Sequence, residues 1–275
     1  MRPVQVPDLS AREVYAACIS KTRPKVKARL QALTEDVVNA ASEFEVAASA
    51  ADLHRLIDLK TNPTDESDRA QLTKNYTQRL TNKDHPAREI YDELKIAGRL
   101  CPLCAHRDVE TLDHQLPKSL YPLLAVVPLN LVPACRSCNT LKSDADPSSA
   151  YDQTLNPYFD DISKEQWLFA RVHEVAPACV SFHVKPPSSW DEVLAARVLW
   201  HFKVFDLAEL YGNQAGRAMT SLRYVLKRKA PSTIPAYLKD EADGGADEDP
   251  NSWKAVMFQA LANSSWYING GFALE

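Results

Sequence analysis

Two C-x₂-C pairs constrain this chain more than any other feature of its sequence. Cys101 and Cys104 form the first pair, Cys135 and Cys138 form the second, and residues 105–134 separate them. Each pair places two thiolates on one tight turn, and two such turns supply the four sulfurs of a tetrahedral zinc site. We therefore expect a structural Zn²⁺ ion bound by these four cysteines, with the intervening residues forming an excursion away from it.

The composition is that of an ordinary globular protein. Hydrophobic residues make up 45% of the 275 residues and charged residues 25%, with a net charge of −4. No apolar run approaches the length of a membrane span, and the first residues contain no apolar core of a secretory signal. We expect a cytoplasmic protein without membrane contact, in which paired cysteines bind metal instead of forming disulfides. The two other cysteines, Cys18 and Cys179, lie in apolar stretches and are expected to be small core residues.

Apolar periodicity predicts an α+β fold that is predominantly helical, in three regions: a helical region 1–97, the cysteine-rich core 98–145, and a region 146–275 with a strand pair and further helices. In the first region, helices are expected over 9–20, 35–60, 67–80 and 86–97. In the third region, strands are expected over 166–174 and 178–185, and helices over 189–211, 213–229 and 252–263. Six of the ten residues 240–249 are acidic and two are glycine, which predicts a solvated, mobile loop.

The excursion between the cysteine pairs contains residues suited to phosphodiester hydrolysis. Asp113-His114 ends a strand-like segment, Asn130 begins a second one, and Asn139 directly follows the last cysteine. A histidine, with an ordinary pKa of about 6.5, can accept a proton from water near neutral pH. Carboxylate and amide oxygens from Asp113 and Asn139 can bind a hard divalent cation. Adjacent strand residues point to opposite faces, so Asp113 and His114 are not both expected to face one metal directly.

Residues 101–142 resemble the HNH endonuclease family, whose fold is the ββα-metal finger. The resemblance lies in the order Asp113-His114, Asn130 and Asn139, bracketed by the two cysteine pairs. It implies that Asp113 and Asn139 bind Mg²⁺ or Mn²⁺ and that His114 activates the attacking water. It also implies that Asn130 pins the loop backbone and orients His114.

The chain departs from the family pattern at two places. Asn139 stands where histidine is usual, which makes the metal ligands all oxygen and favours Mg²⁺ or Mn²⁺. Ala105-His106 follows the first cysteine pair where glycine is common. His106 is either a replacement zinc ligand or a surface residue near phosphate.

Several basic residues are candidates for contact with a nucleic-acid backbone. Lys118 lies in the excursion and Lys142 follows the second cysteine pair, so each is either a phosphate contact or a solvated charge. Two runs without acidic residues are either backbone-tracking clusters or solvated helix faces. They comprise Lys21, Arg23, Lys25, Lys27 and Arg29, and then Arg217, Arg223, Lys227, Arg228 and Lys229.

The resemblance implies a Mg²⁺-dependent endonuclease that hydrolyses phosphodiester bonds of double-stranded DNA. The chain is similar to the stand-alone HNH effectors of bacterial anti-phage defence systems, in which an ATPase or other sensor protein licenses cutting, and helical flanks would suit docking of such a partner. One alternative is a non-catalytic zinc module that binds nucleic acid or protein. Another is a restriction or homing enzyme, which would require a base-reading domain that the sequence does not reveal.

Overall fold

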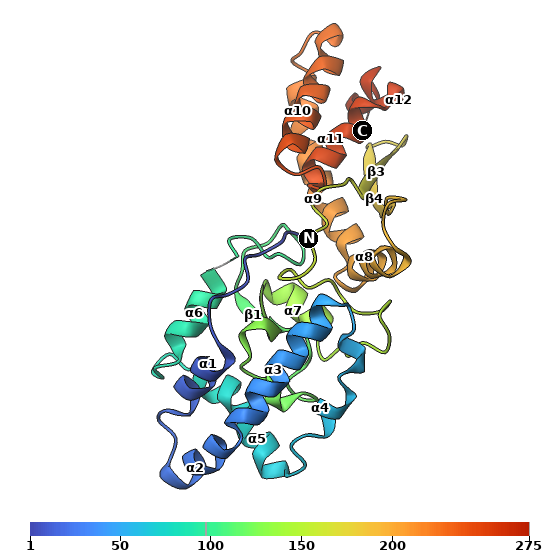
Figure 1. Ribbon diagram of the computed structural model, residues 1–275. Helices are drawn as coiled ribbons and strands as arrows, with labels where there is room; N and C mark the ends of the chain where they lie inside the picture. Colours follow the sequence, from blue (N-terminus) through green and yellow to red (C-terminus); the bar gives the residue numbers. More distant parts are fainter. Residues whose placement is uncertain (97, 275) are drawn as a thin grey trace. The chain divides into compact units, whose positions relative to one another are not determined.

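The computed structural model describes residues 1–96 and 98–274, which form an α+β protein with two small antiparallel sheets (Figure 1). The chain divides into two compact units, Met1–Asp161 and Ile162–Glu275. Both region boundaries expected from the sequence, at residues 97 and 145, fall within the range of the first unit, and Ala97 itself lies outside the described residues. The helical region and the cysteine-rich region share one unit because their apolar side chains enter a common core.

The first unit consists of short helices, one strand pair and several tight helical turns. Its elements are α1 Ala11–Ile19, α2 Pro24–Ala32, α3 Thr34–Ser49, the 3₁₀ turn η1 Leu53–Arg55, α4 Ile57–Thr61, α5 Glu66–Lys74, the π-helix η2 Asn75–Leu80, α6 Arg88–Ile96, β1 Thr111–His114, the 3₁₀ turns η3 Pro122–Leu124 and η4 Pro128–Asn130, β2 Leu131–Ala134 and α7 Arg136–Lys142.

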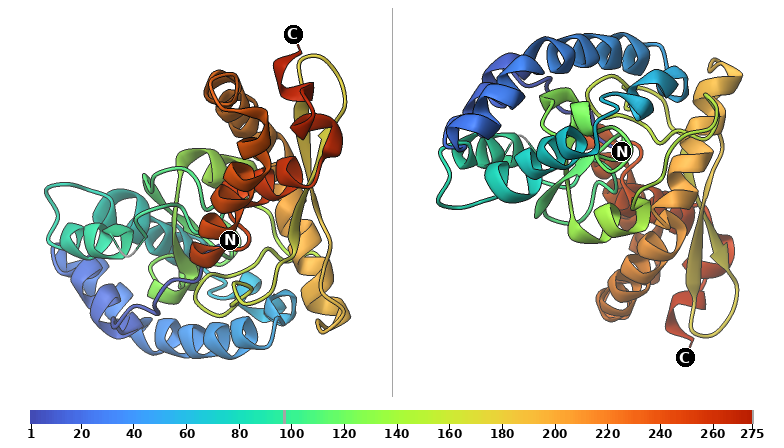
Figure 2. Two further views of the ribbon diagram at one scale, coloured as in Figure 1. Left: turned by 90° about the horizontal axis from the view of Figure 1, so that it is seen from above. Right: turned by 90° about the horizontal axis from the view of Figure 1, so that it is seen from below.

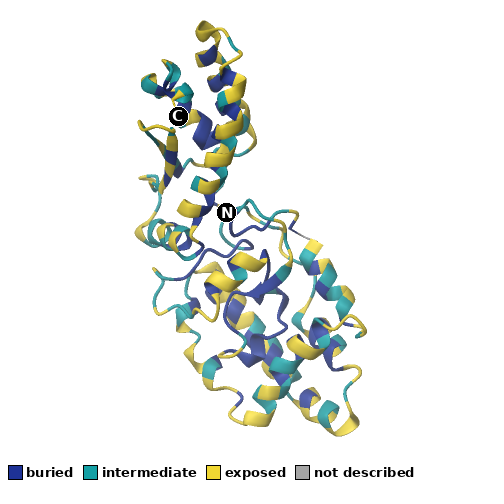
Figure 3. Ribbon diagram, turned by 180° about the vertical axis from the view of Figure 1, so that it is seen from behind, coloured by how far each residue is buried: buried dark blue, intermediate teal, exposed yellow. Residues whose placement is uncertain are grey.

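The strand pair lies among the helices of this unit. β1 and β2 are antiparallel, with His114 opposite Leu131 and Thr111 opposite Ala134, and α7 follows β2 and packs on β1. In both views of Figure 2, helices α1 to α3 (blue) curve around the green segment that holds β1, β2 and α7. Buried leucines and valines from this segment, such as Leu112 and Val127, join those of α1, α3 and α5 in the core, which is dark blue in Figure 3.

The helix expected over 35–60 is interrupted in the structure. α3 ends at Ser49, and Ala51 adopts a left-handed conformation with φ 58°. The amide of Asp52 donates to the carbonyl of Ala47 at 2.7 Å, which closes the helix end as a Schellman motif does. The sequence does not predict that α3 ends here, because alanine and not glycine, the usual residue at such a position, occupies residue 51.

The helix expected over 67–80 is present but changes its winding. α5 runs to Lys74 and continues as the π-helix η2, in which the amide of Thr81 donates to the carbonyl of Tyr76 at 3.1 Å. π-Helical turns are rare in proteins as a whole. Those that occur often lie at functional sites, because they displace side chains from their α-helical positions. Here the π-helix carries Tyr76 toward β1, where its hydroxyl donates to the carbonyl of Leu112 at 2.8 Å.

The second unit contains the strand pair expected in this part of the chain, followed by helices. Its elements are β3 Leu168–His173, β4 Cys179–Val184, α8 Glu192–Val204, α9 Leu207–Leu226, the 3₁₀ turn η5 Pro231–Thr233, α10 Ile234–Glu248, α11 Trp253–Ala262, α12 Ser265–Ile268 and the 3₁₀ turn η6 Gly271–Ala273. β3 and β4 are antiparallel over their whole length; α9 packs on β4 and α11 on β3.

The long helix expected over 189–211 is two helices. α8 begins after Asp191, whose carboxylate accepts the amide of Leu194, so the N-cap is Asp191 and not Ser189. Asp206, with φ 49°, separates α8 from α9. α9 then continues through the second helix expected at 213–229 and ends at Leu226.

Nearly all of the acidic segment 240–249 lies in a helix, α10, so the expectation of a mobile loop is wrong. α10 buries Ile234, Leu238 and Ala242 and packs closely against α11. A Cβ atom on Gly245 would lie 2.9 Å from the Cβ of Ala255, so glycine is required for this close approach. Packing of the apolar face of α10 stabilises the helix even though its sequence is rich in acidic residues and glycine. Tertiary packing here outweighs the low intrinsic helix propensity of the segment.

Candidate metal centre and active site

The four cysteines of the two C-x₂-C pairs meet in the first unit. Their Sγ atoms all lie within 4.8 Å of one another, and all four residues are buried. A tetrahedral zinc with Zn–S bonds of about 2.3 Å requires sulfurs about 3.8 Å apart. The cluster therefore could hold a zinc ion with small adjustments of side-chain torsions. His106 is not part of the cluster that the described residues form.

Local backbone hydrogen bonds shape each cysteine pair into a turn. In the first, the amide of Cys101 donates to the carbonyl of Arg107 and the amide of Ala105 donates to the carbonyl of Cys101, both at 2.7 Å. In the second, Cys135 is the N-cap of α7, and its Sγ accepts the amide of Cys138 at 3.4 Å. Each turn thereby directs both of its thiols to the same point, as metal-binding knuckles do.

The thiols perturb one another strongly, as expected for groups that share a small volume. Hydrogen bonds from the neighbouring thiols, above all that of Cys101, lower the pKa of Cys104 and lower that of Cys135 to about 6. The pKa values of Cys101 and Cys138 are raised, chiefly by the side-chain hydrogen bonds they make within the cluster. Four thiolates cannot coexist at this spacing without a cation, which a divalent metal supplies.

Ala105 gives a direct test of the first turn. Its φ of 50° is left-handed, which costs a non-glycine residue about 1–2 kcal/mol. Ala105→Gly should therefore raise the free energy of unfolding by roughly 0.5–1 kcal/mol, measured by chemical denaturation. The control is Ala16→Gly on the exposed side of α1, which should lower stability by about 1 kcal/mol. A loss of stability in both variants would contradict the left-handed turn.

The strand β1 presents its last two residues to opposite sides. Asp113 lies near α7, where its Oδ2 is 3.3 Å from Nζ of Lys142. His114 lies against the π-helix, with its ring 4.3 Å from that of Tyr76 at an interplanar angle of 69°. Asp113 is 5% exposed and His114 is 6% exposed, so both side chains are almost removed from solvent.

A buried ion pair occupies the Asp113 side of the strand. The ammonium of Lys142, 4% exposed, also donates to the carbonyl of His114. Burial raises the pKa of Asp113, while the charge of Lys142 opposes that rise. Lys142, considered from sequence as a phosphate contact, is thus an interior residue whose charge is already matched by a carboxylate.

His114 is fixed by a single hydrogen bond to the loop that follows β1. Its Nε2 lies 2.9 Å from the carbonyl oxygen of Ala125, which can only accept, so Nε2 carries the proton and Nδ1 is the basic nitrogen. Burial, together with the charge of Lys118, lowers the pKa of His114 to about 3. The imidazole is therefore neutral at neutral pH, with an unprotonated Nδ1, and in this buried state it is a weaker base than an ordinary histidine.

Asn130 ties the same loop together. Its Oδ1 accepts the amide of Leu116 at 2.8 Å, and its Nδ2 donates to the carbonyls of Leu116 and Leu124 at 3.0 and 3.1 Å. Its own carbonyl accepts the amide of Gln115 at 2.8 Å. Since Leu124 directly precedes Ala125, these bonds place the carbonyl that receives His114.

The remaining candidates lie at the edge of this group. Asn139 is half-buried on α7, one turn before Lys142, and therefore on the face of the helix that carries Lys142 to β1. Lys118 is half-buried with its Nζ 5.5 Å from the centre of the Tyr76 ring. Tyr76 was not singled out from the sequence. Nothing local marks it, because the π-helix alone brings it to His114.

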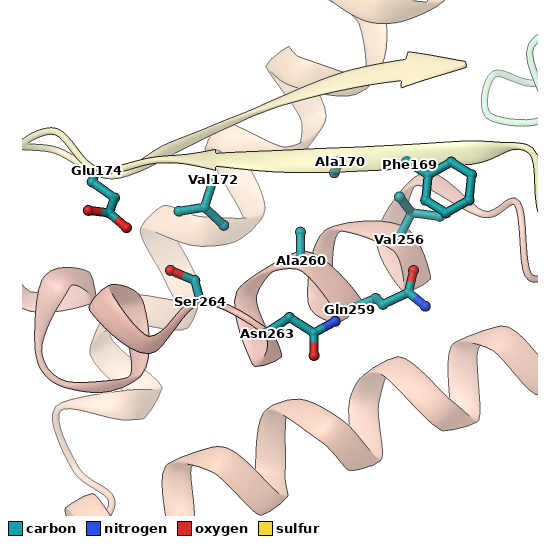
Figure 4. A pocket seen from close by; sticks show the side chains of 9 residues that line it. All are labelled: Phe169, Ala170, Val172, Glu174, Val256, Gln259, Ala260, Asn263 and Ser264. Atoms are coloured by element: carbon teal, nitrogen blue, oxygen red, sulfur yellow. The ribbon is translucent and has the colours of Figure 1, made fainter. Parts of the chain in front are cut away.

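The second unit offers no comparable grouping in its hollow between β3 and α11. That pocket, of about 440 Å³, is drawn in Figure 4, and of its nine lining residues only Glu174 is ionisable. Small or amide side chains such as Ala260, Gln259 and Asn263 form the helix side of the pocket. A single carboxylate without a partner base or metal ligand provides no catalytic arrangement.

Fold and site together define an α+β protein with a buried four-cysteine centre beside a strand–strand–helix arrangement. The chain is 34% identical over 223 residues to Protein ea31 of Escherichia phage lambda, which covers 74% of this chain and 75% of the phage protein. It belongs to the family of that protein. No protein-family profile matches the sequence, and no solved structure matches the fold.

Over residues 1–96 and 98–274, no helix combines the length and the apolar character needed to cross a bilayer.

Proposed function

We propose that this chain is a divalent-metal-dependent HNH-type endonuclease that hydrolyses phosphodiester bonds of double-stranded DNA. The observation that carries the proposal is the fixation of His114. Its Nε2 is bound by the Ala125 carbonyl in a loop that Asn130 fastens at three points. A histidine held in one tautomer, with its basic nitrogen determined by the loop, is arranged as a general base.

Asp113 and Asn139 are the residues that would hold the catalytic cation. Their donor atoms are a carboxylate and an amide oxygen, which suit Mg²⁺ or Mn²⁺. α7 packs on β1, and its face toward the strand carries both Asn139 and the lysine that already contacts Asp113. When bound, such a cation neutralises charge on the scissile phosphate and on the leaving oxygen.

The remaining steps belong to the protein's own side chains. Nδ1 of His114 accepts a proton from the attacking water, while Nε2–H keeps its bond to Ala125 and stabilises the charge that develops on the ring. Lys118, whose ammonium lies over the Tyr76 ring beside His114, contacts the phosphate. Asn130 acts as a positioning residue through the loop.

A second candidate function has one specific observation in its favour. Asp113 is paired with the buried Lys142, and this pair is what a purely structural core would contain. The second candidate is therefore a non-catalytic zinc module that binds nucleic acid or protein. In the nuclease, by contrast, Lys142 must shift away from Asp113 when the divalent cation binds.

We further propose that the nuclease works as one component of an anti-phage defence system, licensed by an ATPase or sensor partner. The support is the resemblance to stand-alone HNH effectors together with the second unit, a strand pair and helices that are not needed to build the site. A partner-licensed nuclease should be a weak and unselective enzyme on its own.

Plasmid cleavage tests this function. The purified protein should nick or cut supercoiled plasmid slowly with Mg²⁺, without discrete fragments, and a chelator should stop the reaction. Added salt should suppress cleavage steeply, because phosphate contacts release counterions on binding. Sequence-defined fragments would favour a restriction or homing enzyme. No cleavage of DNA or RNA with any divalent metal, even with genomic neighbours added, would favour the binding module.

A further inference from the structure

A strongly basic pocket lies in the first unit, away from the cysteine cluster. It encloses about 500 Å³ between the turn that joins α1 to α2 and the α5–η2 helix. Nine residues line it, and none of them is acidic. The hydrogen-bond donors with basic character are Lys21, Arg23, Lys74, Arg79 and His85.

The positive charge of this pocket is not neutralised by the protein. Among the described residues, no carboxylate forms an ion pair with Lys21, Arg23, Lys74 or Arg79. The contrast with Arg29 on α2 is informative, since this arginine pairs with Asp65 and Asp68 near the start of α5. Asp65 and Asp68 therefore neutralise Arg29, and they form no ion pair with the basic residues of the pocket.

Arg79 is held in place by neutral partners. Its Nη1 donates to the carbonyl of Gln71 at 3.2 Å and to Oδ1 of Asn75, and its Nη2 donates to Oε1 of Gln71 at 2.8 Å. Partial burial lowers the pKa of this guanidinium, and no carboxylate is among the groups that oppose this shift. A preorganised guanidinium without a counter-charge is a favourable binding element for a phosphate.

His85 adds a donor of fixed orientation. Its Nδ1 accepts the amide of Ala87 at 3.2 Å, so the proton of the neutral ring lies on Nε2. Burial lowers its pKa, and the nearby charges of Arg79 and Lys21 lower it further. An anion bound between the three side chains would offset the effect of the two cations on this pKa.

The pocket is linked to the proposed active site by one short helix. The π-helix Asn75–Leu80 contributes Arg79 to the pocket and Tyr76 to the surface that contacts His114. A nucleic-acid strand repeats its phosphates every few ångströms, so it can occupy two phosphate sites carried by neighbouring turns of one helix.

We propose that this pocket binds a backbone phosphate of the DNA on which the proposed nuclease acts, and so anchors the substrate beside the catalytic strand. The inference rests on the proposed function for the identity of the ligand. The chemistry it invokes, a phosphate bound by lysine, arginine and histidine donors, is shared with free phosphate, and the test separates the two.

The test compares two double variants of the full chain. Lys21→Gln with Lys74→Gln removes two charges from the pocket, and Arg55→Gln with Lys83→Gln removes two exposed charges from the same unit outside it. Binding to a short fluorescein-labelled DNA duplex is followed by fluorescence anisotropy over a range of salt, without divalent cations, so that no cleavage is required. The pocket variant should bind more weakly, with a salt slope reduced by about 1 for each lost phosphate contact, and the control should retain its slope.

Equal affinity and slope in the two double variants would overturn the proposal, as would wild-type protein that does not bind the duplex. Competition by inorganic phosphate at constant ionic strength, with unchanged duplex binding in the pocket variant, would overturn it in favour of a free-phosphate site. Weakened duplex binding in the pocket variant supports the anchor even if the wild-type protein fails to cut plasmid, so the failure of the nuclease proposal would be seen separately.

Discussion

Cys138→Ala is expected to abolish zinc binding and to unfold the cysteine-rich part of the first unit. Its Sγ is one of four buried sulfurs within 4.8 Å of one another, and the residue lies on α7, which packs on β1. Structural zinc contributes on the order of 10 kcal/mol to the folding of small metal-bound domains, which is comparable to the whole folding stability of a typical domain. The variant should therefore be insoluble, or lose structure by circular dichroism, and elemental analysis should find no zinc.

The control for this experiment is Cys18→Ala. Cys18 is as deeply buried as Cys138, and burial raises its pKa to about 12, but it lies in the apolar core and not in the cluster. Its replacement should lower stability only modestly, by about 1–2 kcal/mol for a small core side chain, and should leave zinc at one ion per chain. A soluble, folded Cys138→Ala protein, or wild-type protein free of zinc, would contradict the zinc centre.

His114→Asn is expected to abolish cleavage while leaving the fold and DNA binding nearly intact. An asparagine can still donate to the Ala125 carbonyl, but it has no nitrogen that accepts a proton. General-base catalysis contributes about 10²–10⁴-fold to the rate, so a slow nuclease would fall below detection. His114→Ala should show the same loss with some additional instability, because it leaves a cavity beside Tyr76.

Asp113→Ala separates the base from the metal site. Raised Mg²⁺ or Mn²⁺ should restore part of the activity of this variant and none of that of His114→Asn, since a metal ion does not replace a base. Because the pKa of His114 is lowered to about 3, the base stays deprotonated when pH falls from 8 to about 5. The wild-type rate should therefore not show the decline near pH 6.5 that an ordinary histidine base produces. Equal cleavage by wild type and His114→Asn would show that the activity lies elsewhere or in a contaminant.

The Asp113–Lys142 pair has a consequence for metal affinity. The carboxylate of Asp113 cannot bind the Lys142 ammonium and a divalent cation equally well at the same time. Separating this buried pair would leave the Lys142 charge without a partner in the interior, which is energetically costly. A divalent cation held by Asp113 and Asn139 would have to displace Lys142, and its interactions with these two residues would have to offset that loss. In the proposed nuclease, this pair would oppose metal binding until substrate or a partner shifts α7.

The sequence by itself determined the features that depend on short spacing. Two residues between cysteines place both thiols on one turn. The two strands and the helix were implied by the resemblance of Asp113-His114, Asn130 and Asn139 to the HNH pattern, and the structure contains them as β1, β2 and α7. The expected strand pair in the second unit is likewise present, because period-two patterning and a central turn are local signals. For the cysteine turns and this strand pair, signals within a few neighbouring residues are sufficient.

Only the tertiary structure decided which distant groups meet. Within the first basic run, Arg29 forms ion pairs with acidic residues at the start of α5, whereas Lys21 and Arg23 line the basic pocket. Nothing in the sequence of the run distinguishes these two outcomes. Lys142 became an interior partner of Asp113, and Tyr76 reached His114 through a π-helix. These outcomes depend on how helices pack around the strands, where burial and charge compensation among residues far apart in the chain outweigh any local preference.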